Sequence, residues 1–222
     1  MRAPRRIISA LLPAGLWAAA ILIAGCSNPS DQLDSQDAAK RFEAIHYLGG
    51  HGDAASVARL GQATEHKDPR TAREAVWALG RAADASASEA LHRVLKTDKR
   101  AEVRQVAVMA LRRRLESDSR QVLRDVARTD PDGAVRAEAA AAVGAVGTLD
   151  DVPFLADLAA ADPSVPVQSR AVGAIETLTG YRFPYDSRAS EEQRRAALER
   201  LKEDACRIAA FQRRFAQQEA GR

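Results

Sequence analysis

Four histidines, His46, His51, His66 and His92, are the side chains of this sequence best suited to bind a metal ion or transfer a proton. Only the first two lie close together, five residues apart, with no cysteine nearby and no His-Glu-x-x-His pattern. This spacing favours histidines that face solvent, so we expect no metal site. The sequence also lacks a Gly-x-Ser-x-Gly turn, a glycine-rich phosphate loop and an evident carboxylate pair. We therefore expect no catalytic residue, no cofactor and no enzyme.

Two cysteines, Cys26 and Cys206, are the other reactive side chains. Cys206 has no histidine in the C-terminal half of the sequence that could activate it as a nucleophile. If Cys26 is modified, Cys206 also has no partner for an intramolecular disulfide. We expect Cys206 to pack on the last helix as a small apolar side chain.

Cys26 follows a segment typical of exported proteins. Three arginines near the N-terminus precede an apolar run over residues 7–24, which closes with Leu-Ile-Ala-Gly-Cys at positions 22–26. This arrangement predicts a signal peptide over residues 1–25. The closing residues resemble a bacterial lipobox, and the resemblance implies that Cys26 becomes the mature N-terminus and carries acyl chains such as palmitate. Two or three chains would anchor the protein stably to a membrane.

An uncleaved membrane anchor is the alternative, because the apolar run is about as long as a short transmembrane helix. Pro13 and Gly15 within the run favour the signal peptide. The lipobox reading predicts a lipoprotein of the bacterial cell envelope. Ser27 after the cysteine is not acidic, which by resemblance to lipoprotein sorting favours the outer membrane or a periplasm-facing position. Residues 26–36 are polar and aperiodic, so we expect a tether there.

The charge balance argues against nucleic-acid binding. The formal net charge is +3 and the pI is ≈ 9.1, but residues 1–25 contain three arginines and no acid. The other 30 of the 33 basic residues balance the 30 acidic ones. Affinity based on phosphate neutralisation normally requires a net basic folded domain. We therefore expect no nucleic-acid partner.

Charge is unevenly distributed between two neighbouring segments. Residues 98–129 hold nine basic side chains against five acidic ones, whereas residues 130–161 hold one against six. Two interpretations remain open: solvated faces that attract each other between neighbouring units, or a concave groove with a basic and an acidic end that binds another protein. In the second, Arg120, Arg124 and Arg128 share one helix face because they are spaced by four residues. The candidate groove residues are His92, Arg93, Arg120, Arg124, Arg128 and Asp157.

A repeated unit of two helices must position these residues. An aspartate opens each unit, at intervals of 30 to 32 residues, and an aliphatic residue closes each first helix; the aspartates are Asp37, Asp68, Asp98, Asp130 and Asp162, and the aliphatic residues are Leu48, Leu79, Leu111, Val143 and Ile175. Arginine lies seven residues before the aliphatic position in three units, while the second and fifth have Ala72 and Gln168 there. Such a period predicts a solenoid over residues 37–180. Hydrophobic residues make up 46% of the sequence and aromatic residues only 5%, which suits closely stacked helices.

The units at Asp98–Leu111, DKRAEVRQVAVMAL, and Asp130–Gly144, DPDGAVRAEAAAAVG, resemble short HEAT repeats, including those of phycobilisome lyase subunits. The resemblance implies an all-α fold, an α-α superhelix of about five helix pairs. Residues 181–222 follow as a loop and a long capping helix, opened by Ser190 with Gln193. Within the loop we expect three aromatic residues to cover the open end of the stack, namely Tyr181, Phe183 and Tyr185.

These observations favour a non-enzymatic, lipid-anchored scaffold that binds another protein. The alternative is an enzyme or chromophore-attachment factor like the phycobilin lyases that share such repeats. Export counts against the alternative, because that chemistry is intracellular. The repeats also lack a cluster of cysteine, histidine and acidic residues suited to it.

Overall fold

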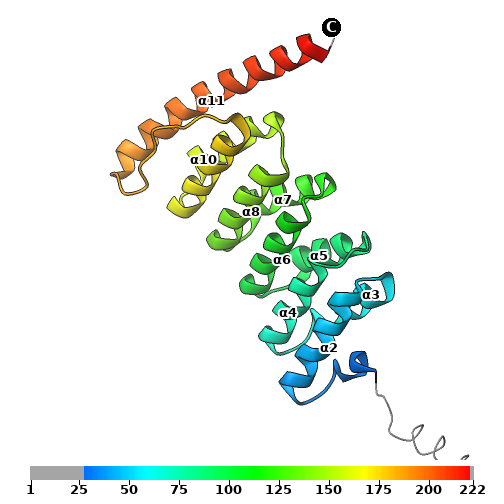
Figure 1. Cartoon of the computed structure of the whole chain (residues 1–222). Coiled ribbons are helices and arrows are strands. Elements are labelled where there is room, and N and C mark those ends of the chain that lie inside the picture. Colours follow the sequence, from blue (N-terminus) through cyan, green and yellow to red (C-terminus); the bar gives the residue numbers. More distant parts are fainter. Residues whose placement is uncertain (1–27, 221–222) are drawn as a thin grey trace, which may run out of the picture.

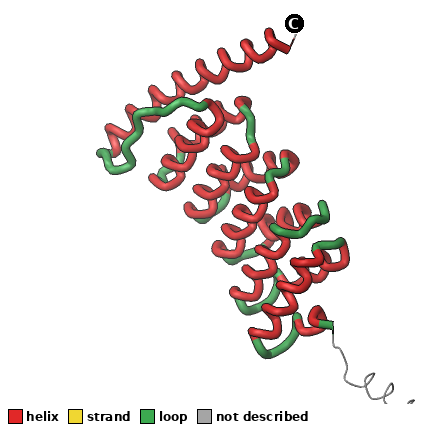
Figure 2. Tube along the Cα trace, viewed as in Figure 1, coloured by secondary structure: helices red, strands yellow, loops and turns green. Residues whose placement is uncertain are grey.

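The computed structural model describes residues 28–220, which form helices and turns without a strand in that range (Figure 2). The predicted all-α fold is thus confirmed. The predicted signal peptide and Cys26 lie outside the described residues and stay predictions. Among the residues described, no helix is long and apolar enough to span a membrane. The α-helices are α2 (Ala38–His51), α3 (Ala54–Ala63), α4 (Pro69–Leu79), α5 (Ser86–Thr97), α6 (Ala101–Arg114), α7 (Arg120–Thr129), α8 (Gly133–Val146), α9 (Val152–Ala161), α10 (Val165–Thr179) and α11 (Glu191–Ala220).

The helices form four consecutive pairs, α2/α3 to α8/α9, followed by α10 and the long helix α11 (Figure 1). The first helices α2, α4, α6, α8 and α10 pack directly against one another in this order. The aliphatic residue predicted to end each unit's first helix is buried in all five units. The predicted solenoid therefore has four full pairs, and in its fifth pair α11 is both the partner of α10 and the cap.

Glycines allow the first helices to approach closely. A Cβ atom added at Gly144 of α8 would lie 2.6 Å from Ala174 Cβ of α10, and one at Gly80 would lie 2.9 Å from Ala110 Cβ of α6. Gly80 also caps the end of α4, as a helix stop signal predicts. Gly144, by contrast, lies within α8, where its function is close packing. Small residues at this seam thus set the spacing of the stack.

The N-terminal end of the stack is closed by residues that the sequence assigned to the tether. Residues Pro29–Gln32 form a short 3₁₀ helix, η1, whose Ser30 is buried, and Leu33 after it is only 7% exposed. Arg59 of α3 donates to the backbone oxygen and the hydroxyl of Ser30, at 2.8 and 3.1 Å. Residues 29–36 are therefore packed on the first helix pair rather than extended as a free linker.

The C-terminal end is covered mainly by α11, which packs on α9. Leu198, Leu201, Ala205 and Ala209 form its buried stripe, and the predicted capping box at its start is present, because Ser190 and Gln193 each accept the other's backbone N–H. Phe183 and Tyr185 pack against the core, as predicted. Tyr181 instead is 52% exposed, so it does not cover the stack.

Candidate functional site

Arginines and aspartates join each repeat to the next. Arg104 of α6 donates to both carboxylate oxygens of Asp130 at 2.8 Å, and the two side chains are 8% and 4% exposed. Arg136 contacts Asp162 in the same way at 2.7 and 3.1 Å, and Arg41 contacts Asp68 at 2.9 Å. Hydrogen bonds to the aspartates raise the pKa values of Arg104 and Arg136, so both remain charged. The periodic arginines of the sequence are therefore structural.

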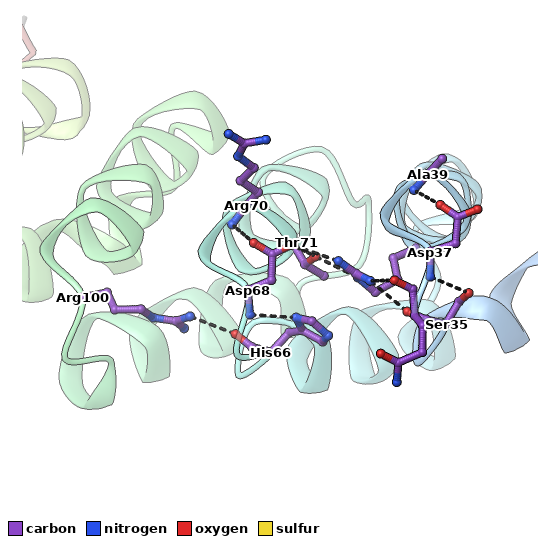
Figure 3. A network of polar contacts seen from close by, with 10 residues as sticks. Ser35, Asp37, Ala39, His66, Asp68, Arg70, Thr71 and Arg100 are labelled. Atoms are coloured by element: carbon purple, nitrogen blue, oxygen red, sulfur yellow. Dashed lines mark hydrogen bonds and ion pairs between the residues drawn. The ribbon is translucent and has the colours of Figure 1, made fainter.

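The second repeat is joined to the third by a different arginine, because Ala72 occupies the position that holds the periodic arginine in other repeats. Arg100 donates to Asp98 at 2.9 and 2.6 Å and to the backbone oxygens of His66 and Thr64 at 2.9 Å each. Figure 3 shows Arg100 reaching His66 in the preceding turn. An arginine from the following unit thus binds the aspartate that Ala72 cannot reach.

The predicted arginine stripe of α7 is divided between two functions. Asp151 at the start of α9 is fully buried, accepts the backbone N–H of Thr148 at 2.8 Å, and is paired with Arg124 at 3.1 Å. Arg120 lies 3.7 Å from the same carboxylate. Arg124 also lies over the ring of Phe154, at 4.6 Å from its centroid. These two arginines connect the third repeat to the fourth, which leaves Arg128 as the exposed member of the stripe.

The acidic side chains of the fourth repeat form ion pairs with cations of the third repeat and of α11. In addition to the contacts of Asp130 and Asp151, Glu138 is paired with Arg112 of α6 at 3.0 Å. Toward the C-terminus, Asp150 pairs with Arg213 at 2.6 Å and Asp157 with Lys202 at 2.8 Å, both on α11. The expected acidic end of a groove is therefore largely neutralised. Of the two interpretations from sequence, attraction between neighbouring units accounts for most of the charge pattern.

Three hollows lie in a row along the second helices α3, α5, α7 and α9. The first lies between α3 and α5 (≈ 460 Å³), the second between α5 and α7 (≈ 510 Å³) and the third between α7 and α9 (≈ 410 Å³). Six positions at 32-residue spacing recur in their linings: residues 90, 93, 94, 97, 98 and 99; 122, 125, 126, 129, 130 and 131; and 154, 157, 158, 161, 162 and 163. The hollows are thus equivalent features of successive repeats, and we call the surface that contains them the second-helix face.

The predicted groove residues are distributed along this face rather than gathered at one site. Arg93 lines the first hollow, and Arg128 and Asp157 line the third. His92 is half-buried and lies 3.0 Å from the hydroxyl of Ser119, which is fully buried. Burial, with a smaller effect of Lys96, lowers the pKa of His92, so its ring is mostly neutral near pH 7. It does not belong to the exposed part of the face.

Two further cations lie on this face that the sequence did not identify as candidate groove residues. Lys96 lines the second hollow, and Lys99 lines both the first and the second. Both are exposed, as are Arg93 and Arg128, and none of the four forms an ion pair within residues 28–220. The 32-residue spacing would have found Lys99, because it is equivalent to Pro131 and Pro163 in the later hollows.

Within residues 28–220, no group of three histidine, cysteine or acidic side chains could hold a metal ion. Cys206 is half-buried on α11, and burial raises the pKa of its thiol. Trp77 and Met109, which apolar spacing predicts to lie in the core, are only half-buried.

The family model for HEAT repeats matches residues 29–112 and 94–176. The structure of the complex of CpcE and CpcF of phycocyanin lyase from Nostoc sp. PCC7120 aligns with a TM-score of 0.49 and 24% identity, over 69% of this chain and 64% of that one. An engineered protein aligns with a TM-score of 0.49 and 18% identity, over 81% of this chain and 96% of its own. The search of curated proteins gave no match. The chain thus spans somewhat less than two thirds of the cyanobacterial chain.

Proposed function

The chain belongs to the HEAT-repeat family, and we propose that it is a non-enzymatic, lipid-anchored scaffold of the bacterial envelope that binds another protein on its second-helix face. Repeat stacks provide extended surfaces of this kind, although a fold by itself does not define a function.

The single observation that carries this proposal is the row of three equivalent hollows with exposed, unpaired cations. Several other arginines of the described repeats are used in packing: Arg104, Arg124 and Arg136 bind aspartates of the next repeat. The cations on the second-helix face form no ion pair within the part of the chain that is described, although Arg128 lies over the ring of Phe154. A protein surface of ordered hollows with available donors is suited to a partner that is bound along its length.

The N-terminal cap supports an anchor close to the fold. Cys26 precedes Pro29, the first residue of η1, by three positions. A chain of three residues spans at most about 10 Å. Acyl chains on Cys26 would therefore hold the first repeat near the bilayer surface, with the second-helix face extending away from it toward α11.

The test is photo-crosslinking in living cells with a reactive amino acid at Lys96 or Arg128, and at Arg113 as the control. Arg113 is an exposed cation of the first helix α6. Arg124 is unsuitable for the probe because its contact with Asp151 would be lost. We expect one and the same protein to be captured from both positions and not from Arg113. Equal capture at all three positions, or none, would contradict the proposed face.

The anchor is tested separately by Cys26→Ser. Metabolic labelling with an alkyne analogue of palmitate is expected to mark the wild-type chain and not this variant. Equal labelling of the two chains, or labelling of neither, would contradict lipidation at this residue, and labelling of neither would favour the uncleaved anchor.

A further inference from the structure

We propose that the partner segment bound on the second-helix face is acidic and adopts a polyproline II helix, so that every third side chain lies over a successive hollow. This inference rests on the proposed function, because it names the chemistry of the segment that the scaffold binds. It follows from the spacing of the hollows, from the hydrogen-bonding groups at their rims, and from the residues at their floors.

The spacing selects the conformation. The hollows recur once per repeat, and the repeat distance is set by the first helices, which pack directly on one another and therefore lie about 10 Å apart. Three residues of a polyproline II helix advance about 9.3 Å and complete one turn, so every third side chain points the same way. A β-strand covers a similar distance in three residues, but its third side chain points to the opposite face. The polyproline II helix therefore matches three equivalent hollows with one side chain each.

The rims favour a segment that offers acceptors. Arg93, Lys96, Lys99 and Arg128 provide only hydrogen-bond donors. Two unpaired acids also line the row, Glu65 and Asp125, and Asp125 already accepts a bond from the Gln121 amide at 2.9 Å. A proline-rich segment has solvated backbone carbonyls and few N–H groups. An α-helix returns a side chain to one face after seven residues, about 10.5 Å, but its backbone groups are already bonded internally. The donors therefore favour polyproline II over a helical partner.

The floors indicate which side chain each hollow takes. Among the apolar lining residues, Ala90 is replaced by Val122 and then by Phe154 along the row, and Leu158 replaces valine in the third hollow. The unpaired cations are concentrated at the first two hollows, where Lys99 lines both. We assign carboxylates to the first and second hollows and an apolar side chain to the third. The pattern is Glu-Pro-Pro-Glu-Pro-Pro-Leu or its reverse.

The inference is tested by fluorescence anisotropy with the full-length protein in nanodiscs of neutral phosphatidylcholine at low salt. The probes are fluorescein-labelled peptides of both directions, a permuted peptide of equal composition whose two glutamates are adjacent, a peptide with lysine in place of glutamate, and a helical peptide with glutamates seven residues apart. We expect one of the two triplet peptides to bind at least fivefold more tightly than the permuted peptide. The lysine peptide is expected not to bind, because it places like charges opposite the cations.

Lys99→Glu is the matched variant and Arg113→Glu is its control, since both reverse one exposed cation. Lys99→Glu is expected to weaken triplet binding at least fivefold, and Arg113→Glu less than twofold. Melting curves of both variants would show that they are folded. Equal binding of the permuted peptide, tighter binding of a helical peptide with glutamates seven residues apart, or no effect of Lys99→Glu would each overturn the inference.

The experiment separates this inference from the proposed function. If crosslinking at Lys96 and Arg128 captures one partner but neither triplet peptide binds, the second-helix face is a binding surface and the polyproline II assignment is wrong. If crosslinking also fails, the proposed function is contradicted together with the inference.

Discussion

Replacing Arg124 by alanine is expected to destabilise the protein, whereas replacing Arg128 is not, although both lie on the same face of α7. Loss of Arg124 leaves the fully buried carboxylate of Asp151 without its nearest cation, at 3.1 Å. Breaking a buried pair costs about 3–5 kcal/mol. Arg124 is 30% exposed, however, and Arg120 remains 3.7 Å from the carboxylate, so we reduce the cost to about 2 kcal/mol.

The lost contact of Arg124 with the Phe154 ring adds about 0.5–1 kcal/mol. For a folded unit of this size, a total of about 2–3 kcal/mol corresponds to a decrease in Tm of about 5–10 °C. Arg128 loses only its own ring contact, at 5.1 Å, which amounts to about 0.5 kcal/mol and a change of about 1–2 °C.

Thermal and urea unfolding followed by circular dichroism would measure both changes. A background of Asp151→Asn serves as the control, because asparagine can still accept the Thr148 N–H but carries no charge. In that background Arg124→Ala should destabilise the protein by at least about 1 kcal/mol less than it does in the wild type. This difference is the coupling free energy of a double-mutant cycle between Arg124 and Asp151. Equal destabilisation by Arg124→Ala and Arg128→Ala, or no coupling to Asp151, would refute the assignment of Arg124 to structure.

Three further predictions concern packing, acid stability and thiol reactivity. Gly144→Ala should lower stability by about 1–3 kcal/mol, because its Cβ would lie 2.6 and 2.7 Å from Ala174 Cβ and Cα. Gly173→Ala, whose Cβ would meet no atom within 4 Å, should instead raise the free energy of unfolding by about 0.5–1 kcal/mol. Equal urea midpoints for the two variants would contradict this interpretation of the two glycines. Hydrogen bonds from Thr71 and the Arg70 N–H, with Arg41, lower the pKa of Asp68 below 3.8, so its stabilisation is present above that pH and lost as the pH falls through the folded-state pKa. The urea midpoint of Asp68→Asn should therefore lie below that of the wild type at pH 6, and the difference between the two midpoints should disappear below about pH 4. A difference that does not change with pH would contradict this role of the Asp68 carboxylate. Because burial raises its pKa, Cys206 should react with iodoacetamide at pH 8 more slowly in the folded protein than in urea, as site-resolved mass spectrometry would show; equal rates would exclude this effect of burial.

The fold was accessible from sequence because its signals are local and periodic. The aliphatic position that closes each first helix is visible as a regular spacing, and in the structure all five of these residues are buried. The capping box at Ser190 is likewise a pattern within four residues. By contrast, Ser86 with Glu89 has the same pattern, yet Ser86 is bonded to Asp84 and α5 has no side-chain cap. A local pattern fails where a neighbouring acceptor competes for the same donors.

The site was less accessible because it depends on contacts between repeats. Arg104 was recognised as periodic, but its partner Asp130 lies 26 residues away in sequence. Gly144 has the sequence signature of a helix stop, and its close contact with Ala174 becomes visible only when two first helices are stacked. Residues 29–36 are polar, yet Arg59 and Arg41 supply donors that fix them on the first repeat. Arg104 and Gly144 were interpreted from their positions in the sequence and residues 29–36 from composition, but in each case contacts with a distant residue determine the structural role.

The arrangement of ion pairs explains how a folded part without net charge can present a directional surface. The acids of the fourth repeat are bound by Arg104, Arg112 and Arg124 on one side and by two cations of α11 on the other. The two pairs with α11 are exposed and contribute little stability singly, but together with the buried pairs they neutralise the C-terminal half of the second-helix face. The unpaired cations are left mainly at the first two hollows, nearer the N-terminal end. Because long-range attraction depends on the charge that remains unpaired, an acidic segment would be oriented with its carboxylates toward that end. If the lipid anchor is also there, the acidic part of the partner would be bound closest to the membrane, and its apolar part at the third hollow.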